Sequence, residues 1–400
     1  MRVAQINSVC GILSTGRIAS DIAKECASFG IENKVFYGYL NDPEKTGIKF
    51  NTDFFVHFDA LLTHLFGHRG SYSKRATKKL IKQLKAYNPD VIHLHNIHGQ
   101  YLNVPMLVNY IKSENKKVVW TLHDCWAFTG DCFYFDKFGC TNWQNGCPEN
   151  CPHLKSQLTN SSAENWRQKK ELFSGIENLT LVTPSEWLKN LAEKSFFKNS
   201  NFKVIYNGIN ISDFKPAAQN FRDEAGLNGK FVIMGMCFSL NETDRKGGKY
   251  LVKLAQSLPD CTVVLLGIQN PPDTLPPNIV CVNKTNSIAR LAEIYSAADV
   301  FVNPTLEDNF PTVNIEALAC GTPVITFNTG GSPEAVDSKT GIVVEKGNFS
   351  ELLAAVNTVR ANTKSYYSNE CRARAERLYN REFMCREYVN LYESMGEKND

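Results

Sequence analysis

Short apolar runs separated by helical patterns occur in two series along the chain, and this alternation restricts the fold more than any other feature of the sequence. Such alternation is typical of βαβ units, whose strands form parallel sheets. We therefore predict an α/β protein with two doubly wound parallel sheets. The predicted strands of the first sheet are residues 3–6, 34–37, 91–95, 118–122, 179–183 and 204–206, and those of the second are 231–236, 262–267, 279–282, 300–303, 324–327 and 342–344.

The sequence also indicates where one sheet ends and the next begins. Its 400 residues, 43% of them apolar, are enough for two domains with separate cores. Between residues 207 and 230, an Asn-Gly pair, a proline and several polar residues interrupt the periodicity, as in a linker. We predict domains at residues 1–207 and 208–379, a last helical segment at 380–400 with a disordered tail from Gly396, and a ligand site in the crevice between the domains.

Charge and composition exclude several classes of protein. The net charge of +3 and the isoelectric point near 8.1 give no argument for nucleic-acid binding. The sequence has no secretory signal pattern and no apolar run of about 18 residues, so we expect a soluble, cytoplasmic protein. The 13 cysteines, an odd number partly in apolar strand patterns, favour reduced thiols over a disulfide framework.

One segment, residues 304–334, carries the strongest functional signal. Asp308 and Glu316 lie on either side of a strand-to-helix turn, and the helix is expected at residues 311–319 with Pro311 at its first position. Unpaired amides at a helix start bind phosphate, and a carboxylate over a turn further on can accept hydrogen bonds from sugar hydroxyls. A second turn containing Gly330 and Gly331 is expected to open beside the first. A lone pair of acids is more often a solvated surface pair, so the interpretation depends on the residues that follow.

Those residues give an ordered pattern: Asp308, seven residues, Glu316, then Ala-Leu-Ala-Cys-Gly and Pro-Val. The pattern resembles the donor-binding core of retaining glycosyltransferases of family 4, in particular colanic-acid-type polysaccharide enzymes. The resemblance implies the GT-B fold, with two Rossmann-like domains facing across a cleft, an acceptor side at residues 1–207 and a nucleotide-sugar side at 208–379. It also implies that the last helix crosses back to the first domain. The family has a Glu where Asp308 stands, and either Asp308 or Glu307 can take its role.

The resemblance implies roles for individual residues. Glu316 would hold the ribose or donor hydroxyls, Asp308 the donor sugar, and His123, after the strand at 118–122, would polarise the reacting sugar; these three are the expected catalytic residues. The expected donor-binding residues are Gly16, Arg17, Ser239, Arg245, Lys246, Glu307, Asn309, Phe310, Pro311, Thr312, Gly330 and Gly331. The expected acceptor-binding residues are Ser14, Thr15 and His98.

The loop at residues 238–248 differs from the family pattern at one position, and the loop at residues 10–18 lacks the glycine pattern of dinucleotide-binding enzymes. In residues 238–248, Lys246 matches the lysine that holds the diphosphate, but Ser239 stands near the place of the usual arginine, and Arg245 can substitute for it. A fixed ammonium there stabilises charge that develops on the leaving diphosphate. Residues 10–18 follow the first strand, but they lack Gly-x-Gly-x-x-Gly, which argues against a dinucleotide enzyme. A simple βα turn is the alternative interpretation of this loop.

Histidine and cysteine clusters raise the question of metal binding. His93 and His95 are expected on one face of their strand, where a buried hydrogen-bonded pair is commoner than a metal site. The cysteine-rich insert at residues 125–151 holds Cys132, Cys140, Cys147 and Cys151, of which only the last two have ligand-like spacing. A structural zinc ion and free thiols packed under tryptophans remain equal alternatives.

Residues 74–85 carry six cations and no acid, with a stripe of Ala76, Leu80, Ile81 and Leu84. The segment is either a solvated basic face over a packed stripe or a peripheral contact with anionic lipid on the inner face of the membrane.

The sequence therefore predicts a retaining hexosyltransferase that uses a nucleotide-sugar donor and a saccharide acceptor, taken to be a lipid-linked intermediate of cell-surface polysaccharide synthesis. No cofactor is expected for catalysis. The alternatives are a catalytically silent glycan- or nucleotide-binding partner protein and a sugar-nucleotide epimerase of the same fold.

Overall fold

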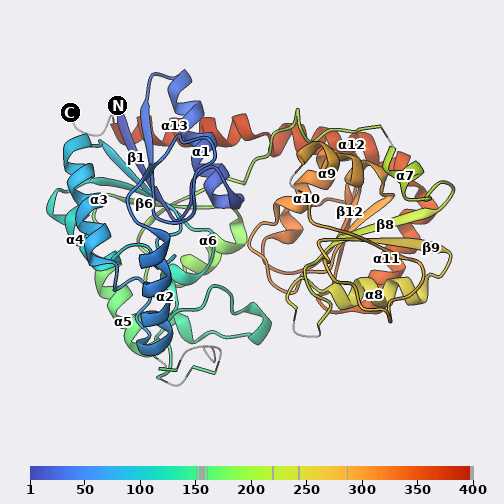
Figure 1. Cartoon of the computed structure of the whole chain (residues 1–400), viewed down its shortest axis with the longest axis horizontal. Coiled ribbons are helices and arrows are strands. Elements are labelled where there is room, and N and C mark those ends of the chain that lie inside the picture. Colours follow the sequence, from blue (N-terminus) through green and yellow to red (C-terminus); the bar gives the residue numbers. More distant parts are fainter. Residues whose placement is uncertain are drawn as a thin grey trace. The chain divides into compact units, whose positions relative to one another are not determined.

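The structure, a computed structural model, describes residues 1–149, 151–152, 158–159, 161–218, 220–241, 244–285 and 287–396. The chain divides into two compact units (Figure 1). Unit 1 comprises Met1–Tyr206 and Met384–Asp400, and unit 2 comprises Asn207–Phe383. Residues 397–400 of the tail expected to be disordered lie outside the described residues.

Unit 1 contains a parallel sheet of seven strands in the order β3-β2-β1-β4-β5-β6-β7. Alternate residues of a strand point to opposite faces, and the core divides accordingly. Val118 and Trp120 of β5 belong to one apolar cluster, whereas Val119 between them belongs to the other. The strands are β1 (Arg2–Asn7), β2 (Glu32–Tyr37), β3 (Ile48–Lys49), β4 (Val91–Leu94), β5 (Lys117–Thr121), β6 (Leu179–Thr183) and β7 (Asn201–Val204).

Helices cover both faces of this sheet (Figure 1). The helix expected to cross back is α13 (Arg381–Gly396), and from Met384 onward it is part of unit 1. Its buried Tyr388, Val389 and Tyr392 join the cluster that contains Val119. The other helices are α1 (Leu13–Ser28), α2 (Asp53–Phe66), α3 (Lys74–Tyr87), α4 (Val104–Ser113), α5 (Ser162–Phe173) and α6 (Glu186–Ala192), with short 3-10 turns η1 (Trp126–Phe128), η2 (Asp136–Phe138) and η3 (Asn142–Gln144).

Unit 2 contains a parallel sheet of six strands in the order β10-β9-β8-β11-β12-β13. The strands are β8 (Phe231–Met236), β9 (Cys261–Leu266), β10 (Ile279–Val282), β11 (Val300–Asn303), β12 (Val324–Phe327) and β13 (Gly341–Val344). The helices are α7 (Asn220–Glu224), α8 (Gly248–Ser257), α9 (Ile288–Ala297), α10 (Thr312–Ala319), α11 (Phe349–Asn362) and α12 (Lys364–Leu378), with a 3-10 turn η4 (Ser332–Ala335). The prediction of two doubly wound parallel sheets is confirmed.

Several local predictions were wrong. The strand predicted at 204–206 is Asn201–Val204, since this half-exposed edge strand has a weak apolar pattern. The two-residue strand β3 was missed because it is too short to show a period. Pro311 precedes α10 rather than starting it. Ser14, Thr15, Gly16 and Arg17 lie in the first turns of α1, not in a loop before it.

The lengths and compositions of the helices bear on whether the chain could cross a membrane. Within the described ranges, no helix combines the length and apolar character needed to span a bilayer.

Candidate active site

The strand order of unit 2 indicates where a ligand can bind. β8 lies between β9, to which the chain continues on one side, and β11 on the other. In doubly wound sheets, ligands bind at the carboxyl ends of the strands where the order changes direction. The loop after β8, residues 237–247, and the loop after β11, residues 304–311, both start at this point. Both loops carry residues that were predicted from the sequence to bind the donor, among them Lys246 and Asp308.

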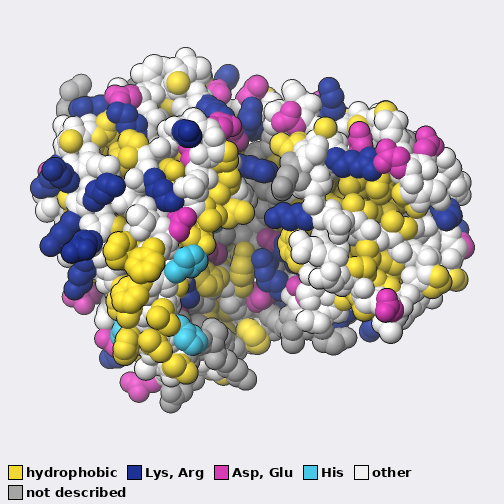
Figure 2. Space-filling model, in the orientation of Figure 1, with side chains coloured by type: hydrophobic (Ala, Val, Ile, Leu, Met, Phe, Trp, Pro, Cys, Tyr) yellow, Lys and Arg dark blue, Asp and Glu magenta, His cyan; other side chains and the backbone are white. Residues whose placement is uncertain are grey.

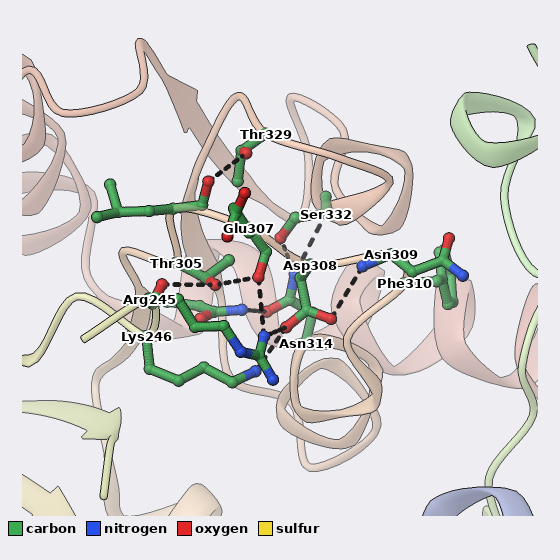
Figure 3. Close-up of polar contacts among 12 residues, drawn as sticks. Arg245, Lys246, Thr305, Glu307, Asp308, Asn309, Phe310, Asn314, Thr329 and Ser332 are labelled. Atoms are coloured by element: carbon green, nitrogen blue, oxygen red, sulfur yellow. Dashed lines mark hydrogen bonds and ion pairs between the residues drawn. The ribbon is translucent and has the colours of Figure 1, made fainter. Parts of the chain in front are cut away.

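The two loops meet through Lys246 and Asp308. The Lys246 ammonium donates a hydrogen bond to Asp308 Oδ2 at 2.5 Å, although the residues are 62 positions apart (Figure 3). Both side chains are mostly buried, with side-chain exposures of 22% for Lys246 and 12% for Asp308. Arg245 lies beside them, with its Nη1 3.9 Å from the same carboxylate oxygen. A carboxylate, an ammonium and a guanidinium therefore converge on one point.

Backbone contacts hold these loops together. Arg245 Nη1 donates to the backbone oxygen of Glu307 at 2.9 Å, and the Leu306 amide donates to the backbone oxygen of Arg245 at 2.7 Å. Thr305 Oγ1 donates to the backbone oxygens of Arg245 and Glu307, each at 3.2 Å (Figure 3). It is the Asp308 carboxylate that bonds to Lys246, whereas Arg245 contacts Glu307 through its main chain. The carboxylate that meets Lys246 is thus that of Asp308.

Two glycines allow the loops to approach each other closely. Gly247 has φ +72°, and a Cβ atom there would lie 2.0 Å from the backbone oxygen of Pro304. Gly330, in the turn after β12, has φ +57°, and its Cβ atom would lie 1.7 Å from the backbone oxygen of Asp308. Both φ values also favour glycine in their own right. The turn after β12 is therefore packed directly on the loop that carries Asp308.

A buried polar network fixes the start of α10, and sequence reasoning missed it. Asn303 Nδ2, at the end of β11, donates to Asn314 Oδ1 at 2.8 Å. Asn314 Nδ2 in turn donates to Ser332 Oγ at 2.9 Å, and Ser332 Oγ lies 2.7 Å from Thr326 Oγ1. A buried amide that is bonded at both ends can adopt one orientation only. Polar residues near the ends of two successive buried strands, Asn303 of β11 and Thr326 of β12, were the sequence signal that could have revealed this network.

The remaining residues predicted in unit 2 lie around this centre. The Asn309 amide donates to Asp308 Oδ1 at 3.0 Å, and Phe310 is buried with its ring 5.7 Å from that of Tyr379. Thr312 is the first residue of α10, and Gly331 precedes η4. Glu316 lies in the second turn of α10, where its Oε2 accepts a hydrogen bond from Tyr295 at 3.0 Å. This hydrogen bond links α10 to α9.

A pocket of about 540 Å³ lies at the carboxyl ends of β8, β9 and β10, and Ser239 is part of its wall. Ser239 was predicted from the sequence, but most of the lining was not, because the loops after β9 and β10 carry no recognisable motif. The rule that ligands bind at carboxyl ends of strands could have found them. The other lining residues are Phe238, Leu240, Asn241, Gly267, Ile268, Gln269, Asn270, Pro272 and Lys284.

In unit 1, hydrogen bonds fix the protonated nitrogen of His123, which follows β5. Gln5 Nε2 donates to the backbone oxygen of Ala19 at 2.8 Å, so Gln5 Oε1 faces His95 Nε2, 2.9 Å away, and accepts from it. Burial lowers the pKa of His95 well below its usual value, so His95 is neutral and its Nδ1 is an acceptor. His123 Nε2, 3.1 Å from that atom, must then donate. In neutral His123 the proton is therefore on Nε2, and Nδ1 is the acceptor nitrogen.

The other predicted residues of unit 1 lie near or apart from His123. His98 Nε2 lies 2.8 Å from Asp124 Oδ2, next to His123 in sequence, and the two histidines line one small hollow. Burial opposes ionisation of Asp124, but the nearby His98 outweighs it and lowers the pKa of this carboxyl group. Thr15 Oγ1 accepts a hydrogen bond from Asn7 at 3.4 Å, and Gly16 is buried against Val9. Ser14 and Arg17 are exposed on α1.

His93 and His95 lie on one face of β4, as predicted, with ring centroids 4.0 Å apart. Both are buried and hydrogen-bonded: His93 Nδ1 lies 2.6 Å from Tyr392 Oη of α13, and its Nε2 lies 2.8 Å from Thr121 Oγ1. Throughout the ranges that the structure describes, no group of three or more His, Cys, Asp or Glu residues is placed to hold a metal ion.

Comparison with known proteins identifies the family. Residues 15–213 match the family described as Glycosyltransferase Family 4, and residues 231–362 match that described as Glycosyl transferases group 1. The chain belongs to these glycosyltransferases. The two matches cover most of unit 1 and most of unit 2, and the interval between them falls within the linker region predicted from the sequence.

The similar proteins include enzymes named for polysaccharide synthesis. Over 328 residues this glycosyltransferase is 26% identical to WcaC of Escherichia coli, named as a colanic acid biosynthesis glycosyl transferase, and the alignment covers 77% of each chain. Among solved structures, sucrose-phosphate synthase from Thermosynechococcus elongatus has a TM-score of 0.71 at 19% identity and covers 98% of both chains. HepE from Anabaena in complex with UDP has a TM-score of 0.69 at 17% identity, covering 98% of this chain and 100% of its own. These structures confirm the GT-B fold.

We expect unit 1 of this glycosyltransferase to lose stability in acid because the folded chain holds the partly buried His123 in its neutral form. Burial lowers the pKa of His123 from 6.5 to about 4, an effect that Asp124 partly offsets. The unfolded chain therefore binds a proton below about pH 6.5, whereas the folded chain does so only near pH 4. By about pH 5, this difference removes about 2 kcal/mol from the free energy of unfolding relative to neutral pH.

The measurement is urea unfolding at neutral and acid pH, followed by tryptophan fluorescence. All five tryptophans (Trp120, Trp126, Trp143, Trp166 and Trp187) lie in unit 1, so the signal reports this unit. The variant His123→Asn should lose about 2 kcal/mol less than the wild-type chain between the two pH values. Equal losses would contradict the assignment of a lowered pKa to His123.

The four cysteines of the insert lie in described positions, although residue 150 between them does not. Burial raises the pKa of Cys132, and the neighbouring Cys151 and Cys147 add to the effect. Cys147 Sγ accepts a hydrogen bond from the Gly130 amide at 3.2 Å. The zinc site stays a prediction. Metal analysis of the purified protein tests it: stoichiometric zinc whose removal by a chelator unfolds the insert would support the site, and metal-free folded protein would favour free thiols.

Proposed function

We propose that this glycosyltransferase moves a hexose from a nucleoside diphosphate donor to a saccharide acceptor, with retention of the anomeric configuration. The contact between Lys246 and Asp308 carries the proposal. The leaving diphosphate gains negative charge in the transition state, and an ammonium that is already held in place stabilises that charge without reorganising solvent. Asp308 holds this ammonium beside the start of α10, where helix amides also favour a phosphate.

The pocket beside Ser239 supports a nucleoside as the other end of the donor. Its volume of about 540 Å³ lies within the usual range of small-molecule sites. Its wall combines the exposed ring of Phe238, suited to stacking on a base, with the side chains of Gln269 and Asn270, suited to hydrogen bonding. The complex of HepE with UDP supports the same class of donor.

Similarity to named enzymes supports the proposed acceptor, and the state of His123 is compatible with the proposed stereochemistry. WcaC and CapM of Staphylococcus aureus are named for colanic acid and capsular polysaccharide biosynthesis, so we propose a lipid-linked saccharide of such a pathway as the acceptor. In a retaining transfer of the front-face type, the acceptor hydroxyl attacks beside the departing phosphate and no enzymic nucleophile is needed. The neutral His123 would polarise the reacting sugar and hold it in position.

We also propose that the transfer needs no metal ion. Lys246, Arg245 and the amides at the start of α10 supply positive charge that a divalent cation supplies in other transferases. Adding a chelator to the turnover assay tests this point, and a loss of activity that magnesium or manganese restores would contradict it.

Calorimetric titration with UDP, GDP, dTDP and ADP, followed by turnover with the matching nucleotide sugars, tests the function. One nucleotide should bind, and its sugar should be transferred to a lipid-linked acceptor with an unchanged anomeric configuration by NMR. We expect Glu316→Ala to weaken nucleotide binding, because the proposed role of Glu316 is to hold ribose hydroxyls. No binding of any nucleotide would reject the proposal. Binding without turnover on any acceptor would favour a silent binding protein, and interconversion of free sugar nucleotides would favour an epimerase.

A further inference from the structure

The outward face of helix α2 in unit 1 is apolar. Phe54, Phe58, Leu61 and Leu65 recur at intervals of three and four residues, so they form one stripe along the helix. These side chains are between 36% and 74% exposed, and Phe55 and Phe66 beside them are 45% and 57% exposed. Figure 2 shows the corresponding group of hydrophobic side chains over α2.

The inward face of α2 is largely polar, whereas the inward face of an ordinary surface helix is apolar. Val56, Asp59 and Thr63 are its buried residues, and Asp59 Oδ2 accepts a hydrogen bond from the Ser73 amide at 3.0 Å. A helix at the surface of a soluble domain normally turns its apolar stripe to the core. Large exposed apolar patches with polar surroundings mark contacts with membranes or partners. Packing within unit 1 therefore does not explain the apolar stripe of α2.

Helix α3 next to it supplies a cationic surface. Ser73, which is bonded to Asp59 of α2, directly precedes α3, so the two helices are joined at this point. The buried residues of α3 are Thr77, Leu80, Leu84 and Tyr87, which means that the apolar stripe predicted there packs inward and cannot enter a bilayer. Its six exposed cations are Lys74, Arg75, Lys78, Lys79, Lys82 and Lys85.

The cations of α3 are largely uncompensated. The helix contains no acidic residue, and among the described residues the one ion pair that its cations form is between Lys85 and Glu114, at 3.2 Å. In Figure 2 the dark blue side chains over α3 appear in the same view as the hydrophobic group over α2. The face of unit 1 drawn in Figure 2 thus carries both an apolar group and positive charges.

We propose that the α2–α3 surface, defined as the six exposed apolar residues of α2 and the six cations of α3, docks on an anionic lipid bilayer. Phenylalanine and leucine side chains enter the boundary between headgroups and acyl chains, while lysines stay at the level of the phosphates. A second copy of the chain fits less well, because a symmetric contact through this surface would bring two rows of cations together. The proposal goes beyond sugar transfer, since binding to lipid needs neither donor nor acceptor.

Sedimentation with vesicles tests the proposal on the full-length chain. Vesicles of phosphatidylglycerol and phosphatidylcholine in equal parts should bind the chain at least about tenfold more tightly than vesicles of pure phosphatidylcholine. The variant Phe54→Ser/Phe58→Ser should reduce binding to the anionic vesicles by at least about tenfold, and Lys78→Gln/Lys82→Gln should reduce it by about fivefold per lysine. All four side chains are exposed, so these variants should fold.

Matched controls distinguish lipid binding through this surface from non-specific adsorption of the protein to vesicles. Tyr366→Ser removes a ring that is 66% exposed on α12 of unit 2, and Lys194→Gln/Lys198→Gln removes two exposed cations elsewhere in unit 1; both should bind like the wild-type chain. Equal binding to both vesicle types, or equal binding by the α2 and control variants, would overturn the proposal. A dimer in sedimentation that Phe54→Ser/Phe58→Ser dissolves would overturn it as well, because a second copy would then cover this face.

Discussion

Replacing Lys246 with alanine is expected to lower kcat by about 100- to 1,000-fold, the range found when one preorganised donor is removed from a site of developing charge. The ammonium lies 2.5 Å from Asp308, in a position that the loop after β8 reaches because Gly247 packs on Pro304. Steady-state kinetics with the nucleotide sugar identified by calorimetry measure the effect. Lys253→Ala is the matched control, because Lys253 is exposed on α8, the helix that follows the same loop, and its loss should change kcat by less than about twofold.

A double variant distinguishes two roles for Lys246. If the ammonium acts on the diphosphate, Lys246→Ala should remain severely defective in an Asp308→Asn background. If it serves only to neutralise Asp308, removing that carboxylate should largely remove the need for lysine, and the double variant should be no slower than Asp308→Asn alone. The second result, or a Lys246→Ala variant with near-normal kcat, would contradict the proposed role.

Replacing Gly330 with alanine is expected to destabilise unit 2 by more than about 3 kcal/mol and to abolish transfer. The new Cβ atom would lie 1.7 Å from the backbone oxygen of Asp308 and 2.9 Å from its carbonyl carbon, so the loop that carries Asp308 must move. Hydrogen exchange of the β11 and β12 amides measures the effect in unit 2, because the tryptophans report unit 1 alone.

Gly226→Ala is the matched control for this substitution. Gly226 has φ +64°, close to the +57° of Gly330, but nothing lies within 4 Å of the Cβ atom that it would acquire. Its substitution should therefore carry the backbone strain alone, about 1–2 kcal/mol, and leave turnover unchanged. If the two variants were equally stable and active, the close contact between the turn after β12 and Asp308 would not matter for the site.

Sequence reasoning predicted most of the strands and the loops that hold the site. The strands of unit 2 were found to within one residue, because buried parallel strands are short, apolar and bounded by turn residues. Errors occurred where that pattern weakens: at the edge strand β7, at the two-residue β3 and at the start of α1. Asn314 and the residues around the pocket beside Ser239 escaped notice because their importance comes from contacts across the sheet, not from a local pattern.

The outward apolar face of α2 was not predicted either. From the sequence, the stripe of Phe54, Phe58, Leu61 and Leu65 has the period of a core-facing helix. Only the packed structure shows that Val56, Asp59 and Thr63 face inward instead. Periodicity identifies a helix and its two faces, but it does not say which face the rest of the chain covers.

The sequence by itself determined that this chain forms two parallel α/β sheets, and its ordered motif from Asp308 to Val324 determined the family to which it belongs. Both properties depend on residues that are close together along the chain, so hydrophobic periodicity and turn residues are enough to predict them. Only the tertiary structure decided that Lys246 meets Asp308 across 62 residues, that Gln5 and His95 select the nitrogen of His123 that carries its proton, and that α2 turns its apolar side outward. These are distant contacts, and they exist only once the sheet order has brought the strand ends together.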